Sequence, residues 1–406
     1  EVPEFDPHHA EFDRVRIWKG RLLREAWSAF QSGDWPAMRR AVSHFEAQER
    51  EWLDDFALYM AIKEAHDFAP WWEWPAELAH REAAAIRKAR RLLHQEVHFQ
   101  KFIQFLFFRQ WRAIREAAAE RGITIMGDVP IYVAQDSADV WANRELFQLD
   151  EDGAPTVVAG VPPDYFSATG QRWGNPLYRW DVLRESGYRW WISRIRTNLE
   201  LTDIVRLDHF RGFAAYWEIP AHEPTAIHGR WMPGPGKALF DALQNALGGL
   251  PLVAEDLGFI TPEVHELRRA IDVPGMRVLQ FGFGQPDSPH LPHRFEVRSV
   301  VYTGTHDNDT ALGWFDSAPE AERELAQAYL GDDCRDISWA LIRAAYTSVA
   351  ETAIVPVQDV LSLGSEARMN TPGDADHNWS WRLQPGALTG EHAARLRHLA
   401  EITGRA

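Results

Sequence analysis

The sequence predicts a TIM-type (β/α)8 barrel with helical and loop insertions. Three apolar segments, 204–207, 252–254 and 300–302, run directly into polar clusters that contain Asp208, Glu255 and Asp307. These carboxylates are about 50 residues apart, which leaves room for one or two βα units of about 30 residues between them. Because the carboxyl ends of barrel strands all surround the active-site mouth, we expect the three carboxylates to meet there.

The chain begins with a helical region and changes to a βα pattern after residue 203. Residues 1–120 are nearly strand-free, with a long run of helix formers at 76–120, and a β-type segment at 123–127 follows them. Proline and glycine interrupt residues 153–175, which predicts a functional loop without regular structure. The remaining expected strands lie at 203–207, 251–254, 278–282, 299–303 and 354–357, and the helices among them at 262–270, 319–329 and 336–350.

These elements predict a helical insertion subdomain at 1–120 and a catalytic barrel at 121–406, with an insertion at about 131–200. The pattern contains six core strands, whereas a closed barrel of this type has eight. The helical first 120 residues leave no place for the other two. We therefore expect the first two barrel strands to be missing from this chain.

Composition narrows the class of ligand. The 406 residues carry a formal net charge of −16, which argues against nucleic acid and anionic membrane surfaces and suits a neutral substrate. No apolar run approaches the ~20 residues of a membrane span. The single cysteine, Cys334, excludes an intrachain disulfide. Several of the 19 tryptophans lie in polar or proline-bounded runs, at 70–75, 171–175 and 378–382, where aromatic faces beside hydrogen-bonding groups suit a sugar; about half are expected to be core.

The strand-end residues suit glycosidic chemistry. Arg206 and Asp208 are two residues apart, so on a strand they face the same side, and the arginine favours the ionised carboxylate that a nucleophile needs. A buried structural ion pair is the alternative. Glu255 suits a general acid/base if its surroundings raise its pKa. Two such carboxyl groups suffice for hydrolysis or transfer, with Asp307 stabilising the cationic transition state or holding hydroxyls and His306 donating beside it.

The sequence gives weaker evidence for a further ligand-contact residue and for a metal site. Asp128 is a fourth strand-end carboxylate, for which a structural and a ligand-contact role are about equally expected. His306, Asp307 and Asp309 are possible metal ligands, but the sequence has no His-Glu-x-x-His, cysteine cluster or calcium-loop spacing. We therefore expect neither a metal nor a cofactor.

Longer motifs identify a family resemblance. They are Gly127-Asp128-Val129-Pro130-Ile131, Val158 to Ser167, Gln171-Arg172-Trp173-Gly174-Asn175-Pro176, Arg206 to Phe213, Ala254-Glu255-Asp256-Leu257-Gly258, Gly304 to Thr310, and Gly364 to Asn370. In these stretches the chain resembles the amylomaltases, also called 4-α-glucanotransferases or disproportionating enzymes, which are relatives of the α-amylases. The resemblance extends over nearly the whole chain. The resemblance implies roles for eleven residues. Asp208 would be the nucleophile, Glu255 the acid/base and Asp307 the transition-state stabiliser; Arg206, His306 and Asp128 would line the donor subsite; Tyr165 and Phe166 would lie on a mobile lid; Asp164, Gln171 and Trp173 would contact substrate.

The same resemblance implies a reaction. Such enzymes transfer an α-1,4-glucan segment from one maltooligosaccharide to the 4-hydroxyl of another, with retention through a covalent glycosyl-Asp intermediate and without a cofactor. The family would place this in cytoplasmic maltodextrin or glycogen metabolism. Its members begin with further residues that supply the first two barrel strands, and nothing here matches them. Two alternatives stay open: an α-glucan hydrolase with the same carboxylates, or an inactive glucan-binding protein if those strands are truly absent.

Overall fold

The computed structural model describes residues 2–163, 167–374 and 376–405. The chain forms two compact units, one made of residues 22–273 and the other of residues 1–21 together with 274–406. No helix in these ranges combines the length and the apolar character needed to cross a membrane. The division into a helical subdomain at 1–120 and a barrel at 121–406 stays a prediction.

The first 120 residues are helical, as expected. Their helices are α1 (Phe12–Ser32), α2 (Pro36–Gln48), α3 (Arg50–Ala65), α4 (Ala76–Ala79), α5 (Ala83–Leu92) and α6 (His94–Ala119). Aromatic packing joins them: Phe30 stacks on Phe102 with ring centroids 4.8 Å apart, and Phe45 lies 5.3 Å from Phe108. Large aromatic faces bury well at helical spacing, so this region has a hydrophobic cluster of its own.

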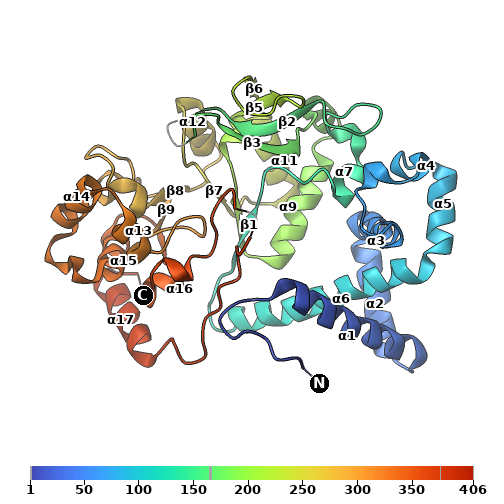
Figure 1. The fold of residues 1–406 in the computed structure, drawn as a ribbon, viewed down its shortest axis with the longest axis horizontal. Helices are drawn as coiled ribbons and strands as arrows, with labels where there is room; N and C mark the ends of the chain where they lie inside the picture. Colours follow the sequence, from blue (N-terminus) through green and yellow to red (C-terminus); the bar gives the residue numbers. More distant parts are fainter. Residues whose placement is uncertain (1, 164–166, 375, 406) are drawn as a thin grey trace. The chain divides into compact units, whose positions relative to one another are not determined.

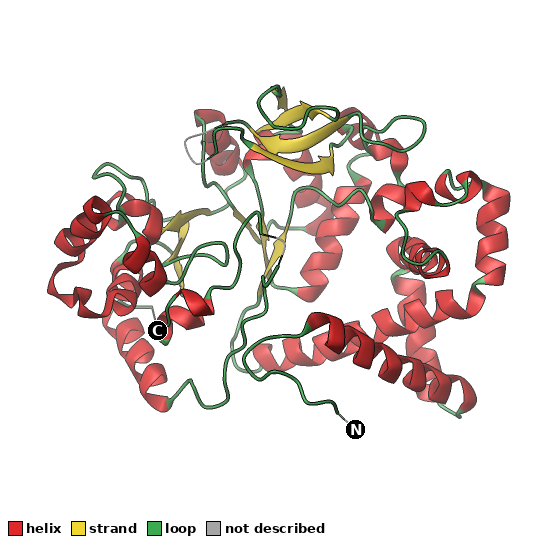
Figure 2. Ribbon diagram, viewed as in Figure 1, coloured by secondary structure: helices red, strands yellow, loops and turns green. Residues whose placement is uncertain are grey.

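Three parallel strands lie in the unit of residues 22–273. They are β1 (Met126–Val129), β4 (Ile204–Leu207) and β7 (Leu252–Ala254), with β4 in the middle. Helices α9 (Arg189–Leu201), α11 (Lys237–Leu247) and α12 (Pro262–Ala270) alternate with them. The short helices that follow residue 120 in this unit are α7 (Ala138–Ala142), α8 (Trp180–Glu185) and α10 (Arg211–Ala214). Figure 2 draws the helices in red and the strands in yellow. The register pairs Asp128 with Arg206, so the polar ends of β1 and β4 are neighbours.

A second, antiparallel sheet in the same unit corrects the expectation for residues 153–175. Its strands are β2 (Val157–Val161), β3 (Gln171–Pro176), β5 (Ala215–Pro220) and β6 (Arg230–Pro233), in the order β3-β2-β5-β6 (Figure 1). The prediction of an irregular loop was wrong because a glycine in this segment allows two strands to approach closely, instead of marking a loop. A Cβ on Gly160 would lie 2.2 Å from the Gln171 carbonyl oxygen, so only glycine permits this approach of β2 to β3.

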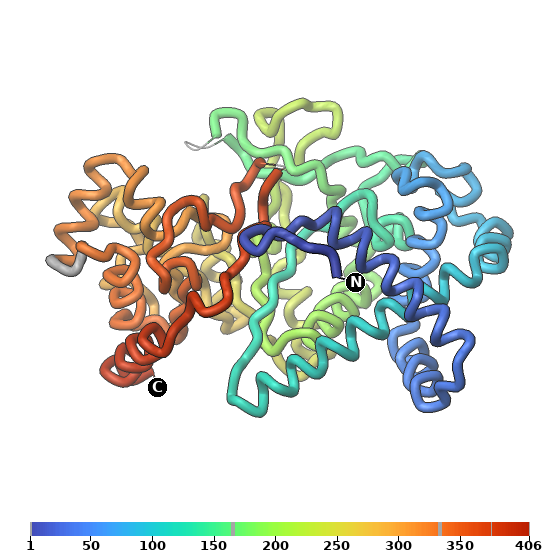
Figure 3. Tube along the Cα trace, turned by 60° about the horizontal axis from the view of Figure 1, so that its bottom comes forward, coloured from blue at the N-terminus to red at the C-terminus, as the bar shows by residue number. Residues whose placement is uncertain are grey.

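The other unit contains three more parallel strands. They are β8 (Gly275–Val278), β9 (Ser299–Tyr302) and β10 (Thr352–Ile354), with β9 in the middle. Its helices are α13 (Ala311–Ser317), α14 (Glu320–Leu330), α15 (Ile337–Thr347), α16 (Val357–Val360) and α17 (Gly390–Ile402), which Figure 3 traces from orange to red. The described ranges thus carry six parallel strands, three in each unit, and the expected α/β class and strand number are confirmed.

One strand of this unit lies outside its expected place. The strand predicted at 278–282 is at 275–278, and a 3-10 helix (Leu279–Gly282) follows it. Gly275 and the buried Arg277 interrupt the apolar pattern of the true strand. The more continuous apolar pattern after them therefore led to a predicted strand that was too far along the chain. The strand predicted at 354–357 starts two residues earlier, at Thr352, within the usual uncertainty of element ends.

Candidate active site

Arg206 lies between two carboxylates at the ends of β1 and β4. Its Nη1 donates to both carboxylate oxygens of Asp128, at 2.8 and 2.7 Å, and its Nη2 lies 3.0 Å from Asp208 Oδ1. The arginine side chain is only 9% exposed, whereas the two carboxylates are 42% and 43% exposed. The buried cation therefore holds two accessible anions, and Arg206 and Asp208 face the same side of the strand, as predicted.

The charge on Arg206 is permanent. Burial alone would lower its pKa, but the neighbouring carboxylates of Asp128 and Asp208 outweigh burial and raise it above its ordinary value. Asp208 thus has a fixed positive charge within hydrogen-bonding distance at every pH at which the protein is folded. Such a partner favours the ionised form of a carboxylate.

Glu255 follows β7 and is held by two backbone amides. Its Oε2 accepts a 2.8 Å hydrogen bond from the His209 N–H, and its Oε1 accepts a 2.9 Å hydrogen bond from the Leu257 N–H. Burial and the charge of Asp208 raise the pKa of Glu255 to about 7, although Arg206 and the two amides act in the opposite direction. A carboxyl group with this pKa exchanges its proton near neutral pH, which is the property of a general acid/base.

The side chain of His209 is not suited to act as the general acid/base. Burial lowers its pKa to about 4, so its ring is neutral near pH 7. Its backbone is left-handed, with φ of 50°, and this conformation turns its N–H toward Glu255. His209 therefore orients Glu255 through its main chain rather than donating a proton through its side chain.

Two residues predicted to contact substrate lie beside this strand end. The Trp173 ring meets the His209 ring edge-on at a centroid distance of 4.7 Å, and Trp173 Nε1 donates a 3.1 Å hydrogen bond to Gln171 Oε1. Trp173 is 38% exposed, so part of its face is open. Within residues 22–273 the structure therefore groups Asp128, Arg206, Asp208 and Glu255 with Trp173 and Gln171.

The loop after β9 carries the third predicted carboxylate. Asp307 accepts a 2.6 Å hydrogen bond at Oδ1 from Asn370 Nδ2, and its backbone carbonyl accepts a 2.8 Å hydrogen bond from Arg368 Nη2. His306 Nε2 lies 3.4 Å from Asp307 Oδ2, and its ring is 5.0 Å from the half-exposed Trp379. The structure thus places His306 beside Asp307, as predicted.

Sequence reasoning assigned no role to Arg368 and Asn370. They lie in the polar stretch 364–370, which follows no apolar strand, so the strand-end signal that marks the carboxylates is absent there. Their inclusion in a motif of the family resemblance was the one available signal. The remaining predicted residues, Asp164, Tyr165 and Phe166, lie outside the described residues.

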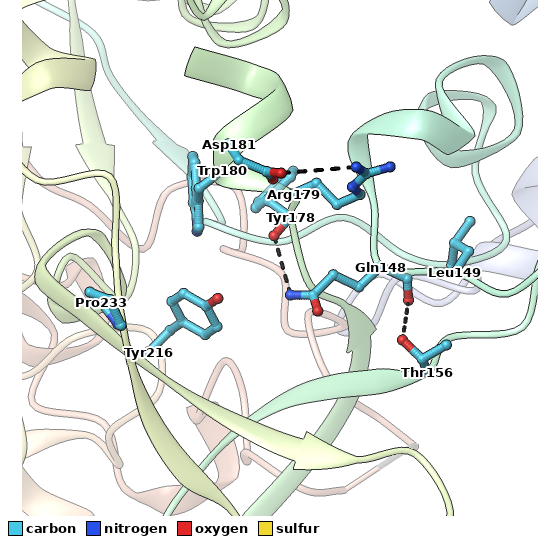
Figure 4. Close-up of a pocket in the computed structure, with 9 residues that line it drawn as sticks. All are labelled: Gln148, Leu149, Thr156, Tyr178, Arg179, Trp180, Asp181, Tyr216 and Pro233. Carbon is cyan, nitrogen blue, oxygen red and sulfur yellow. Dashed lines mark hydrogen bonds and ion pairs between the residues drawn. The ribbon is translucent and has the colours of Figure 1, made fainter. Parts of the chain in front are cut away.

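A pocket of about 510 Å³ in residues 22–273 lies elsewhere. It is lined by Gln148, Leu149, Thr156, Tyr178, Arg179, Trp180, Asp181, Tyr216 and Pro233. Figure 4 shows the Gln148 amide and the Tyr216 hydroxyl pointing into the same space, with Gln148 Nε2 donating to the Tyr178 carbonyl at 3.4 Å. None of these lining residues is a predicted site residue, so this pocket is separate from the strand-end carboxylates.

Known proteins match the chain over its whole length. The family of glycoside hydrolases numbered 77, described as 4-alpha-glucanotransferase, matches residues 2–389. The 4-alpha-glucanotransferase of Thermus thermophilus is 52% identical over 414 residues, covering 100% of this chain and 83% of that protein. The Synechocystis 4-alpha-glucanotransferase is 48% identical over 410 residues, covering 100% of this chain and 81% of that protein.

A solved structure agrees with these sequence relatives. The amylomaltase from Streptococcus agalactiae in complex with acarbose has a TM-score of 0.95 and 36% identity, and the match covers 99% of this chain and 82% of that one. At this similarity the fold is that of the amylomaltases. The chain therefore belongs to glycoside hydrolase family 77, the 4-alpha-glucanotransferases, or amylomaltases.

Proposed function

We propose that the 4-alpha-glucanotransferase activity of this chain proceeds with retention through a covalent glycosyl-Asp208 intermediate. The observation that carries the proposal is the contrast between two neighbouring carboxyl groups. Asp208 has the permanent charge of Arg206 at 3.0 Å, while burial and the Asp208 charge raise the pKa of Glu255 to about 7. Environments that separate two carboxyl groups in this way assign one as the nucleophile and the other as the proton donor.

In the first half-reaction, an oxygen of ionised Asp208 attacks the anomeric carbon of the glucosyl unit. The bond between that carbon and the leaving O4 breaks, and protonated Glu255 gives its proton to the leaving oxygen. The products are a glycosyl ester on Asp208, a shorter glucan with a free 4-hydroxyl, and ionised Glu255.

In the second half-reaction, Glu255 acts as the base. It takes the proton from the 4-hydroxyl of an acceptor glucan, whose oxygen attacks the anomeric carbon and releases Asp208 as a carboxylate. Two displacements at one carbon retain the α configuration, and Glu255 regains the proton it gave. Asp307 is the proposed stabiliser of the cationic transition state in both steps, with Asn370 orienting its carboxylate.

The substrates we propose are maltooligosaccharides and α-1,4-glucans. The acarbose in the Streptococcus agalactiae relative supports this class of ligand. Trp173, with its exposed face beside the carboxylates, supplies a surface on which the C–H face of a sugar can stack. Exclusion of water from the covalent intermediate favours transfer over hydrolysis. Cytoplasmic maltodextrin or glycogen metabolism is the proposed setting.

The deciding experiment incubates the purified chain with maltotriose alone and separates the products. We expect glucose together with a ladder of longer maltooligosaccharides, whereas glucose and maltose without longer products would favour an α-glucan hydrolase. Asp208→Asn should lower turnover by about 10⁴-fold or more while glucan affinity stays. Asp241→Asn is the matched control, because Asp241 is an exposed aspartate whose partner is Lys237 at 2.5 Å. Wild-type binding of glucan without turnover would overturn the proposal in favour of a glucan-binding protein.

A further inference from the structure

The loop of residues 303–311, which we call the Asp307 loop, is closed at both ends by one carboxylate. Asp359 Oδ2 accepts a 2.5 Å hydrogen bond from the Thr303 hydroxyl, and Asp359 Oδ1 accepts a 2.7 Å hydrogen bond from the Ala311 N–H. Thr303 is the residue directly after β9, and Ala311 is the first residue of α13. A single side chain therefore fixes the distance between the two points where the loop leaves and rejoins regular structure.

Burial makes these bonds consequential. Asp359, Thr303 and Ala311 each have 0% exposure, so water does not replace either hydrogen bond if it is lost. Burial raises the pKa of Asp359, whereas its bonds from Ala311 and Thr303 lower it, and the charge of Asp309 raises it further. A buried carboxylate next to another acidic residue is costly, and loop anchoring is the function that its two hydrogen bonds serve.

The inside of the Asp307 loop is equally constrained. Asn308 Oδ1 accepts hydrogen bonds from both the N–H and the hydroxyl of Thr305, at 2.9 and 2.8 Å. The Gln280 amide donates a 2.9 Å hydrogen bond to the Asp309 carbonyl, and the Ser365 hydroxyl donates a 2.7 Å hydrogen bond to Asp309 Oδ2. The loop is thus a set of tight local turns whose ends depend on Asp359.

Helix α16 links this loop to the segment that binds Asp307 from the other side. The neighbour of Asp359, Gln358, donates a 3.2 Å hydrogen bond to the Ala367 carbonyl and is itself buried. Ala367 directly precedes Arg368, which binds the Asp307 carbonyl, and Asn370 binds the Asp307 carboxylate. Two adjacent side chains of one short helix therefore anchor both segments that determine where the Asp307 carboxylate lies.

We infer that Asp359 is a positioning residue for glucosyl transfer, which acts by holding the Asp307 loop in register with α16. This inference rests on the proposed role of Asp307. A carboxylate that stabilises a developing cation must be placed accurately, because a displacement of about 1 Å is enough to lower a rate by about 100-fold. The position of Asp307 depends on the loop ends, and Asp359 is the side chain that joins them.

The test compares Asp359→Asn, Thr303→Val and Asp307→Asn in the full chain, with disproportionation of maltotriose and thermal unfolding as readouts. The asparagine keeps an acceptor for the Ala311 N–H, but its NH2 group replaces the oxygen that accepts from the Thr303 hydroxyl. That hydroxyl can then only accept a reversed, uncharged hydrogen bond, which is weaker than its bond to a carboxylate. We expect Asp359→Asn to lower kcat by about 5- to 10-fold with KM changed less than about threefold, because it alters the Thr303 end of the contact and keeps the Ala311 end. Thr303→Val, which removes only the hydroxyl, should lower kcat by about 5- to 10-fold.

Asp336→Asn is the matched control for a purely structural effect. Asp336 also accepts hydrogen bonds from a backbone N–H at a helix start, Trp339, and from a hydroxyl, Ser362, at 3.3 and 3.0 Å. It contacts no residue of the Asp307 loop among the described residues. Because the Asp336 side chain is 40% exposed, we expect a smaller loss of melting temperature, with kcat within about twofold of wild type.

The outcomes separate the two proposals. If Asp307→Asn keeps its turnover, the proposed role of Asp307 is wrong and the positioning role falls with it. If Asp307→Asn is inactive but folded Asp359→Asn has wild-type kcat, the positioning role alone is overturned. Should Asp359→Asn fail to fold, Thr303→Val decides, and an unchanged kcat in that variant overturns the inference.

Discussion

Asn370 Nδ2 donates a 2.6 Å hydrogen bond to Asp307 Oδ1 across 63 residues of sequence. Arg368, two residues earlier, donates to the Asp307 main-chain carbonyl at 2.8 Å. One segment therefore holds both the side chain and the backbone of Asp307. The partner at Oδ1 is a neutral amide, which orients the anion without cancelling the charge that a cationic transition state requires.

Asn370→Ala should lower kcat by about tenfold and Asn370→Asp by about 100-fold. The alanine removes the orienting bond, whereas the aspartate puts a second negative charge against Asp307 and disfavours its ionised form. Steady-state kinetics on maltotriose measure both effects. Asn198→Ala is the control, since Asn198 donates a 2.8 Å hydrogen bond to the Arg194 carbonyl and has no place in the site. Equal kcat values for Asn370→Asp and wild type would contradict this orienting role.

Arg206→Lys should lower kcat/KM by about 100-fold or more. A lysine has one ammonium group, which cannot reproduce the two nitrogens that reach Asp128 and Asp208 together. Asp128→Asn, which keeps the arginine beside Asp208, should cost only about tenfold. The comparison uses Arg230→Lys as control: Arg230 also makes two hydrogen bonds to one carboxylate, Glu218, but is 71% exposed. Activity of Arg206→Lys at the level of Arg230→Lys would show that the geometry of the arginine does not matter.

The positions of two carboxylates, Asp208 and Glu255, were predictable because each follows an apolar strand. Asp208 and Glu255 directly follow strands whose burial is visible in the sequence as an apolar run, and Asp128 is the third of four residues in the neighbouring β1; parallel strands bring their carboxyl ends to one edge. Arg368, Asn370 and Asp359 carry no such signal. They lie on a short helix or an irregular segment and contact Asp307 or its loop through tertiary hydrogen bonds, which no local periodicity encodes.

The fold shows the same division between local and non-local information. Helix α12 occupies the predicted range 262–270, because Pro262 at its first position and its apolar spacing are local signals. The strand β8 was misplaced because the buried Arg277 has the appearance of a surface residue. Strands β2 and β3 were missed because their pairing depends on a glycine contact between chain segments, and in sequence a glycine indicates a loop.

Trp173→Ala should raise KM for maltotriose by about tenfold with a smaller change in kcat. The indole offers an exposed face next to His209, and loss of an aromatic stacking surface weakens ground-state and transition-state binding alike. Trp72→Ala is a close control, because Trp72 is 37% exposed against 38% for Trp173 and packs edge-on against Trp71 instead. Kinetics over a range of maltotriose concentrations separate the two parameters. An unchanged KM in Trp173→Ala would remove this residue from the sugar-binding surface.

Glu255 should set the alkaline limit of activity. The free enzyme needs Glu255 protonated to donate to the leaving oxygen, and its pKa is raised to about 7 by burial and by Asp208. The value of kcat/KM should therefore fall by about tenfold for each pH unit above about 7. Asp208→Glu and Arg206→Lys keep the charges next to Glu255 but change their positions, so they should shift the pH at which this fall begins, whereas Asp241→Asn should leave it in place. If kcat/KM falls above the same pH in all variants, a group other than Glu255 causes the fall.

The raised pKa of Glu255 also makes the free energy of unfolding depend on pH. Its ordinary pKa is 4.5 and its folded value is about 7, so the folded state holds the proton more tightly and loses stability as pH rises from 4.5 to 7. Glu255→Gln does not titrate. The difference in free energy of unfolding, Glu255→Gln minus wild type, should therefore increase by about 1–3 kcal/mol between pH 4.5 and 8. This value is reduced because the Glu255 side chain is partly exposed to solvent.

The pH dependence of that difference is the measurement, because the glutamine also loses one of the two amide contacts from His209 and Leu257 at every pH. Urea unfolding at pH 5, 6, 7 and 8 separates the two effects. Glu263→Gln is the control of opposite sign: a hydrogen bond with Thr261 lowers the pKa of Glu263, so its charged form favours folding at higher pH. A Glu255→Gln difference that is flat from pH 5 to 8 would mean that Glu255 keeps an ordinary pKa, and a proton donor at neutral pH would then have to be found elsewhere.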